Sequence, residues 1–417
     1  MLATHNEIIK DTQIWKFCFY GFFKNLRFFE PYLLIYLLGM GLNLFNIGIL
    51  LSVREAITYI FEVPSGIIAD HYGKRKELLL CFVFYIASFI FFFMGSNFII
   101  LSIGMVFFGL GEAFRSGTHK AIILSYLEHK GWFSHKAFVY GRTRSYSLLG
   151  SAISSFFSIL LVLNLPSLRW IFLVCIIPYI LDFMLILSYP KYLDDKVVLN
   201  LSLKGFYLES IKQLKSVNSN LTLKKVLASS ALYDGVFKAI KDYIQPILKI
   251  LLVTAGIGIV MGLNIDKSLN VYLGLIYGVF YIFSSIASKN IYRLTAKISS
   301  YVVFEKFFDV MGLLLLVLSY AIRQEFIFIA ILVYFGLYIM KDARRPVFVD
   351  VCSDYMNKNQ RATVLSIESQ IRALFMMIMA PTFGWIAVHY SVGDLFFVIG
   401  VLLLIVNRFM ILEKNNR

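Results

Sequence analysis

Apolar runs of about twenty residues recur along the whole chain, and short polar turns separate them. A helix needs about this many apolar residues to cross a bilayer, where its backbone must be hydrogen-bonded internally. The runs therefore predict roughly twelve membrane-spanning helices. We place them at residues 15–38, 46–69, 77–95, 98–124, 139–164, 168–189, 226–255, 269–288, 299–320, 326–345, 362–388 and 392–412.

The composition indicates a membrane protein. Apolar residues make up 59% of the chain and charged residues 16%, and the mean hydropathy is +0.75. Soluble proteins have about 45–50% apolar and about 25% charged residues. The net charge of +15 does not indicate a nucleic-acid partner, because the basic residues occur in short clusters between the apolar runs.

These basic clusters predict the orientation of the spans. One set of connections holds 17 Lys and Arg residues, whereas the alternate set holds two. The basic set is 70–76, 125–138, 190–225, 289–298 and 346–361. Because cytoplasmic loops carry the excess of Lys and Arg, we expect both termini in the cytoplasm. The expected location is a bacterial inner membrane, with lipid as the surroundings and a monomer as the unit.

The order of the spans predicts an all-α protein of two six-helix bundles, at 1–189 and 226–417. The polar stretch 190–225 joins them. Its apolar residues share one helical face, and its lysines lie on the other; a disordered linker is the alternative to this amphipathic helix on the membrane surface. The residues concerned are Leu203, Phe206, Tyr207, Ile211 and Leu214, with Lys204, Lys212 and Lys215.

The sequence shows no arrangement that indicates an enzyme or a cofactor. It has no Gly-x-x-x-x-Gly-Lys-Ser/Thr phosphate loop and no visible nucleophile–base pair. Four histidines near the predicted cytoplasmic turns lack the spacing of metal ligands. We therefore expect neither catalysis nor a bound metal or cofactor.

Charged residues lie inside several predicted spans, where each is costly unless it faces a cavity or a partner. Spans 1, 4, 7 and 10 carry most of them. These charged residues either form fixed ion pairs between helices or line a solvated path for a small molecule. For Arg54, both an ion pair with Glu30 and a contact with substrate stay open. The candidate cavity residues are Arg27, Glu30, Tyr32, Arg54, Glu112, Arg115, Lys238 and Asp342.

The seventh span carries a stripe of alternating charge. Asp234, Lys238 and Asp242 follow one another at i,i+4 and so share one helix face. One lysine cannot neutralise two carboxylates, whereas Glu30 and Glu112 each have an arginine three residues away that stays protonated. We therefore expect Asp234 and Asp242 to exchange protons.

A basic turn between the second and third spans has a defined spacing. Residues 66–76 read Gly-Ile-Ile-Ala-Asp-His-Tyr-Gly-Lys-Arg-Lys. The pattern Gly-x-x-x-Asp-x-x-Gly-x-Arg-Lys resembles the signature loop between helices 2 and 3 of the major facilitator superfamily of transporters. Stretches 62–70, 108–118 and 361–366 resemble the bacterial drug-efflux-like branch of this twelve-helix family.

The resemblance implies a conformational gate built on this loop; marking the cytoplasmic side is the alternative role of its basic residues. In this family Gly66 would allow close packing of helices 2 and 11, and Gly73 would permit the turn. Helices 1, 4, 7 and 10 would line the central cavity, which matches the charged spans. Glu305 and Asp309 in the ninth span do not fit that division.

Two ion pairs would complete the gate by the same resemblance. Asp70 would pair with Arg361 at the start of the eleventh span. Arg75 would meet Glu128 near the end of the fourth.

The resemblance implies secondary transport of small molecules by alternating access. Proton-coupled efflux of amphipathic compounds is our first expectation, with import of a polar metabolite as the alternative. A membrane scaffold, receptor or enzyme is the third. The Arg-x-x-Gln-Gly pattern of proton-coupled exporters is absent from span 4, and span 5 lacks an internal proline, so proton antiport is an analogy.

The topology predicts which positions can be labelled from outside the cell. Single cysteines at Asn43, Asn97 and Lys267 should react with a membrane-impermeant maleimide, because their turns carry few basic residues. Cysteines at Lys74 and His135 should react only after permeabilisation. Labelling at Lys74 in intact cells would reverse the predicted orientation.

Overall fold

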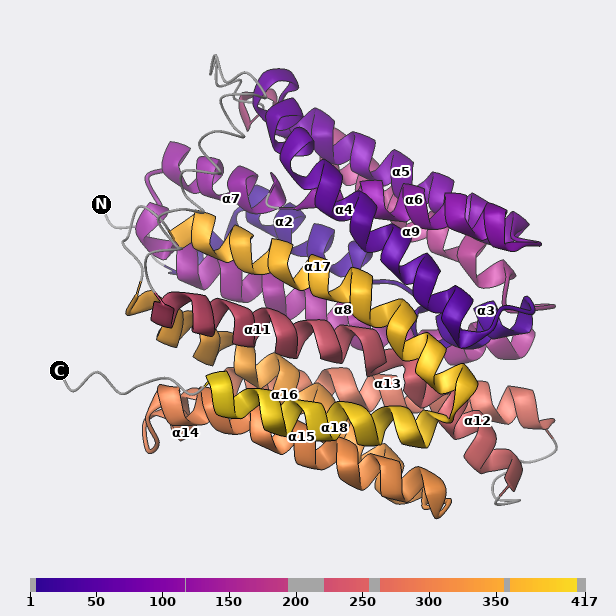
Figure 1. Cartoon of the computed structure of the whole chain (residues 1–417). Helices are drawn as coiled ribbons and strands as arrows, with labels where there is room; N and C mark the ends of the chain where they lie inside the picture. The colour runs from indigo at the N-terminus through magenta and orange to yellow at the C-terminus, as the bar shows by residue number, and fades with distance from the viewer. Residues whose placement is uncertain (1–4, 117, 194–220, 255–262, 356–360, 411–417) are drawn as a thin grey trace. The chain divides into compact units, whose positions relative to one another are not determined.

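The computed structural model describes residues 5–116, 118–193, 221–254, 263–355 and 361–410, and these residues are helical throughout, with short connections (Figure 1). The helices of the N-terminal part are α1 (His5–Lys10), α2 (Thr12–Lys24), η1 (Glu30–Tyr32), α3 (Leu33–Gly39), α4 (Leu44–Tyr72), α5 (Lys74–Met94), α6 (Phe98–Arg115), α7 (Thr118–His129), η2 (Phe133–His135), α8 (Lys136–Asn164), α9 (Trp170–Leu187) and η3 (Lys191–Leu193). Those of the C-terminal part are α11 (Leu221–Ile240), η4 (Lys241–Tyr243), α12 (Ile244–Thr254), α13 (Ile265–Asn290), α14 (Tyr292–Thr295), α15 (Ser300–Arg323), α16 (Ile327–Ser353), α17 (Arg361–His389) and α18 (Val392–Met410). The expected all-α architecture is confirmed.

Eight membrane-length apolar helical segments occur in the described ranges. They correspond to the predicted spans 2 to 6, 8, 11 and 12. Spans 9 and 10 are the continuous helices α15 and α16, of 24 and 27 residues. Their charged residues make these two helices more polar than the eight segments above. The remaining two, 15–38 and 226–255, differ from the prediction because each is interrupted: α2 and α3 are separated by residues 25–32, and α11 and α12 by η4.

Polar residues at the turns determine where several helices begin. The Asp11 carboxylate accepts hydrogen bonds from the backbone N–H groups of Gln13 and Ile14 at the start of α2. Asn97 and Asn264 cap α6 and α13 in the same way. These side chains satisfy donors that have no partner within the helix. Gly73 has φ 100° just before α5, a backbone conformation that favours glycine.

The chain forms two compact units. The first comprises Met1–Pro31 and Val53–Lys204, and the second Tyr32–Ser52 and Gly205–Arg417. In the first unit α5 packs along α6 and α9, and α2 packs on α8 and α9. In the second, α15 packs along α16 and α18, and α11 along α17 (Figure 1). The predicted amphipathic helix in the central stretch lies outside the described residues.

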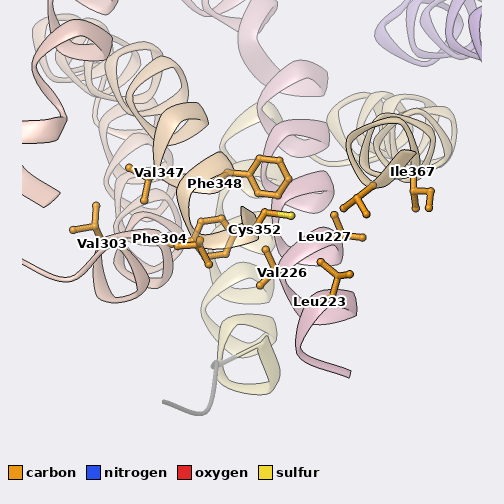
Figure 2. Close-up of a cluster of buried hydrophobic side chains, with 11 residues drawn as sticks. Leu223, Val226, Leu227, Val303, Phe304, Val347, Phe348, Cys352 and Ile367 are labelled. Atoms are coloured by element: carbon orange, nitrogen blue, oxygen red, sulfur yellow. The ribbon is translucent and has the colours of Figure 1, made fainter. Parts of the chain in front are cut away.

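Four helices of the second unit share a buried apolar cluster (Figure 2). The cluster joins α11, α15, α16 and α17 at one end of these helices. Its members are Leu223, Val226, Leu227, Val303, Phe304, Val347, Phe348, Val351, Cys352, Val364 and Ile367. Dispersion contacts of this kind are what hold helices together in lipid, where burial from water adds little.

The second and eleventh spans, α4 and α17, approach each other closely at two glycines. A Cβ atom on Gly48 of α4 would collide with the Ala380 carbonyl of α17, and one on Gly384 with the Leu44 carbonyl. Ser52 donates a hydrogen bond to the Met377 carbonyl in the same crossing, 2.7 Å away. Gly66 is exposed, and a Cβ there would meet no atom within 4 Å. Within the second unit, the backbones of α4 and α17 therefore touch at Gly48 and Gly384.

This difference predicts opposite effects of two alanine substitutions in one helix. Gly48→Ala should destabilise the protein by about 1–3 kcal/mol, since the methyl group forces the two helices apart. Gly66→Ala should be neutral or stabilising by about 0.5–1 kcal/mol, because alanine is the better helix former. Thermal unfolding of both variants in the same detergent measures the contrast. Equal losses would mean that the α4–α17 crossing is absent.

Candidate functional site

The first predicted span is broken where its charged residues lie. Helix α2 ends at Lys24, residues 25–29 are irregular, and η1 with α3 resumes the path at Glu30. Irregular backbone at membrane depth is tolerated only where protein or a water-filled cavity surrounds it. Tyr179 donates a hydrogen bond to the freed Lys24 carbonyl over 3.1 Å, and Asn25 donates to the Gly21 carbonyl over 2.6 Å. The break thus presents Arg27 without leaving these backbone groups unpaired.

Glu112 of α6 is the centre of a charge network in the first unit. Its carboxylate accepts a hydrogen bond from Arg27 at 2.7 Å and another from Arg115, one turn along the same helix. Arg27 also donates to the Tyr179 hydroxyl, and Arg115 to the Tyr85 hydroxyl, each over 3.2 Å. One carboxylate between two guanidinium groups leaves a net positive charge, which can attract an anionic group.

Aromatic rings surround this network. The Arg27 guanidinium carbon lies 5.4 Å from the Phe108 ring centroid and 6.0 Å from that of Tyr85. Phe29 packs edge-on against Phe108, with ring centroids 6.1 Å apart. Tyr85 and Tyr179 make a similar contact at 5.2 Å. The first unit therefore combines fixed charge with flat apolar surfaces, and cation–π contacts hold the guanidinium in place.

The break in the seventh span carries a second polar chain, in the second unit. Lys241 pairs with Asp242 at 2.9 Å, and the Tyr277 hydroxyl donates to the same carboxylate at 2.9 Å. Gln245 donates to Tyr277 over 3.1 Å, and its carbonyl oxygen accepts from the backbone N–H groups of Leu34 and Ile35, over 2.9 and 3.1 Å. Gln245 therefore caps α3. A small enclosed cavity borders Asp242 in this region.

Asp234, the other acid of the predicted stripe, lies in a separate cluster. Its carboxylate is 3.8 Å from Arg345 of α16 and 3.7 Å from Arg372 of α17. Both arginines also hold Glu368, at 2.8 and 3.3 Å, and the Glu368 side chain is 0% exposed. The two acids thus have different partners on different elements. The sequence pattern, in which both share Lys238 on one helix face, did not predict these partners.

The other predicted cavity residues are dispersed. Arg54 pairs with its neighbour Glu55 at 3.0 Å and lies 6.0 Å from the Phe108 ring. Asp342 pairs with Lys341 at 2.9 Å. Tyr32 is buried beside the start of α3. Lys238 is in the last turn of α11, and Glu30 begins η1.

The predicted gate contacts are described only in part. Arg75 donates to the backbone carbonyls of Ile186 and Leu187 at the end of α9, whereas its predicted partner Glu128 is exposed. Carbonyls in the last turn of a helix lack intrahelical partners, so they attract a guanidinium. The side chains of Asp70 and Arg361 lie outside the described residues.

Sequence reasoning missed several residues that build these clusters. Glu368 and Arg372 lie four residues apart within an apolar run, so their charge was a usable signal. Tyr85, Tyr179 and Gln245 carry no comparable signal, because tyrosine and glutamine in a span are compatible with many positions. Only the packing of the helices identifies them.

The Glu112 network predicts a loss of stability on neutralisation. Glu112→Gln leaves two partly buried guanidinium groups without their carboxylate, which should cost on the order of 3 kcal/mol. Asp266→Asn removes an exposed ion pair with Lys249 and should have little effect. Unfolding of the two variants in one detergent, followed by intrinsic fluorescence, compares them. A Glu112→Gln protein as stable as the wild type would show that the network contributes nothing to folding.

Comparison with known proteins shows the family. The sequence profile of the Major Facilitator Superfamily matches residues 16–367. A 90-residue stretch is 32% identical to the Uncharacterized MFS-type transporter YxaM of Bacillus subtilis (strain 168), and it spans 22% of this chain and 23% of that protein.

Solved transporter structures have the same fold. The nucleoside transporter NupG superposes with a TM-score of 0.77 at 12% identity, covering 97% of this chain and 100% of that one. A POT family transporter in complex with 5-aminolevulinic acid gives 0.73 at 14%, covering 95% of each chain. A D-xylose-proton symporter gives 0.72 at 14%, covering 99% of each. At these low identities the solved structures show that the fold is shared. The profile match over residues 16–367 shows the family. This chain is an integral membrane transporter, not an enzyme, and it belongs to the Major Facilitator Superfamily.

Proposed function

We propose that this secondary transporter exports amphipathic small molecules by alternating access and is driven by protons. The observation that supports the proposal is the Arg27–Glu112–Arg115 network enclosed by aromatic rings. A solute with a charged group could exchange for one partner in the network while its apolar part lies on Phe29, Phe108 or Tyr85. Export and membership of the drug-efflux-like branch rest on the sequence resemblance.

Proton coupling is proposed at Asp234 and Asp242. Asp234 faces Arg345 and Arg372 on two other helices, so a movement between those helices would change its neutralisation. Asp242 lies in the break of the seventh span, with Lys241 and Tyr277 as partners. An acid whose partners separate in one state of the cycle is suited to take up a proton. The proposed gate at Gly66–Arg75 would open and close with the same conformational change.

Import of a polar metabolite is the second candidate. It is favoured by the charge of the network itself, and the structures with the same fold include a nucleoside transporter and a D-xylose-proton symporter. A sugar or nucleoside would use the hydrogen-bonding groups of Tyr85, Tyr179 and Glu112 without needing an apolar surface.

Transport by the purified protein in proteoliposomes distinguishes the two candidates. We impose a proton gradient across the membrane. We expect fluorescein, an amphipathic anion, to move in the direction opposite to the protons, with an accompanying change in internal pH. D-xylose should not move. The double variant Asp234→Asn/Asp242→Asn should lose the response to the gradient, whereas Asp266→Asn, whose acid is exposed, should keep it. D-xylose uptake without dye transport would favour the import candidate, and an unaltered pH response in the double variant would exclude these acids from coupling.

A further inference from the structure

Asp182 is a buried acid in the first unit that the function above does not use. It lies in α9, five residues before the helix ends at Leu187, and the residue is 0% exposed. Neither of its carboxyl oxygens has a hydrogen-bond partner among the residues that the structure describes. Partly buried Glu112 and buried Glu368 differ in this respect, because each is held by two arginines.

An ionised carboxylate is very unfavourable in such a place. Burial of a charge without a counter-ion in hydrogen-bonding contact or donors is far more costly than burial of the neutral acid. The nearby arginines cannot help, because Arg27 and Arg115 are already bound to Glu112. We therefore propose that Asp182 is a proton-binding site, which holds a proton in this conformation and releases it when the helices rearrange.

The surroundings of Asp182 contain groups that could receive the proton. Lys24 and Tyr20 of α2 both act electrostatically on it, and so does Tyr189, which follows α9. The backbone N–H of Lys24 also lies near the carboxyl group, but outside hydrogen-bonding geometry. The Tyr20 hydroxyl is itself buried without a partner in the described part of the chain. The other charged or titratable groups around Tyr20 are Cys81 of α5, with Glu112 and Arg115 of α6.

Three polar rings, those of Tyr20, His119 and Tyr189, follow one another near the end of α9. The Tyr20 ring stacks on His119, with centroids 3.6 Å apart and planes 12° apart. The His119 Nε2 atom lies 3.4 Å from the Tyr189 hydroxyl oxygen. In the proposed release the helices rearrange first; the O–H bond of the Asp182 carboxyl then breaks, and the proton passes to the His119 imidazole. The new carboxylate is then balanced by the Lys24 ammonium group.

Infrared spectroscopy of the protein in lipid nanodiscs tests the site without any substrate. A protonated carboxyl has a carbonyl stretching band that a carboxylate lacks. At neutral pH we expect the wild type to show this band and Asp182→Asn to lose part of it. The matched control is Asp309→Asn, since Asp309 accepts hydrogen bonds from Asn407 at 2.7 Å and Lys306 at 3.1 Å and should be ionised. That variant should keep the wild-type band.

Two further measurements keep the test independent of folding defects in the variant. Carbon-13 labelling of the aspartate carboxyls in the wild type should move the band to lower frequency. His119→Phe should retain the band and slow its shift on transfer to deuterated water, because the acceptor next to Tyr20 is lost. A wild-type spectrum with no aspartic acid band, or an Asp182→Asn spectrum identical to it, overturns the proposal. Use of this site for coupling rests on the proposed proton-driven transport; its protonation does not, so the two can fail separately.

Discussion

Every backbone polar group at membrane depth needs a partner within the protein. The charged clusters of this structure depend on how that requirement is met at two helix breaks, residues 25–32 and 241–243. The first and seventh spans are interrupted, and side chains replace the missing intrahelical bonds. In the first span Tyr179 donates to the Lys24 carbonyl, and Gln245 accepts from the N–H groups of Leu34 and Ile35; in the seventh, Tyr334 donates to the Ile240 carbonyl. Tyr179 also accepts from Arg27, and Gln245 donates to Tyr277, which donates to Asp242, so the repair of the backbone and the construction of the site are one arrangement.

The breaks also explain why charge is stable so deep in the chain. Arg27 in the first break reaches Glu112 because it is released from helical geometry, and the acid then binds two guanidinium groups. In the seventh span, Asp242 gains Lys241 and Tyr277 in the same way. Paired charges of this kind are costly to break, but they can exchange partners with a charged solute. Asp182 follows the opposite rule, since it is buried with no hydrogen-bond donor among the described residues, and burial favours the neutral acid.

Much of the fold was predictable because the bilayer imposes a simple length on apolar helices. Residues 77–95 and 168–189 were predicted to within a few positions of α5 and α9. The breaks at 25–32 and 241–243 were not, because the hydropathy of those runs is compatible with continuous helices. For the same reason the crossing of α4 and α17 at Gly48 and Gly384 was not predicted, because a sequence alone does not say which glycine meets another backbone.

The amino-acid sequence by itself determined the helical membrane class, the approximate span positions and the family, because hydropathy and a short loop motif are local properties. It also indicated which spans carry charge. Tertiary structure alone decided the partners: Glu112 with Arg27, Asp234 with Arg345 and Arg372, and Asp182 with none of the described donors. An ion pair or an unpaired acid depends on distances between residues far apart in the chain, and only the packing of the helices sets those distances.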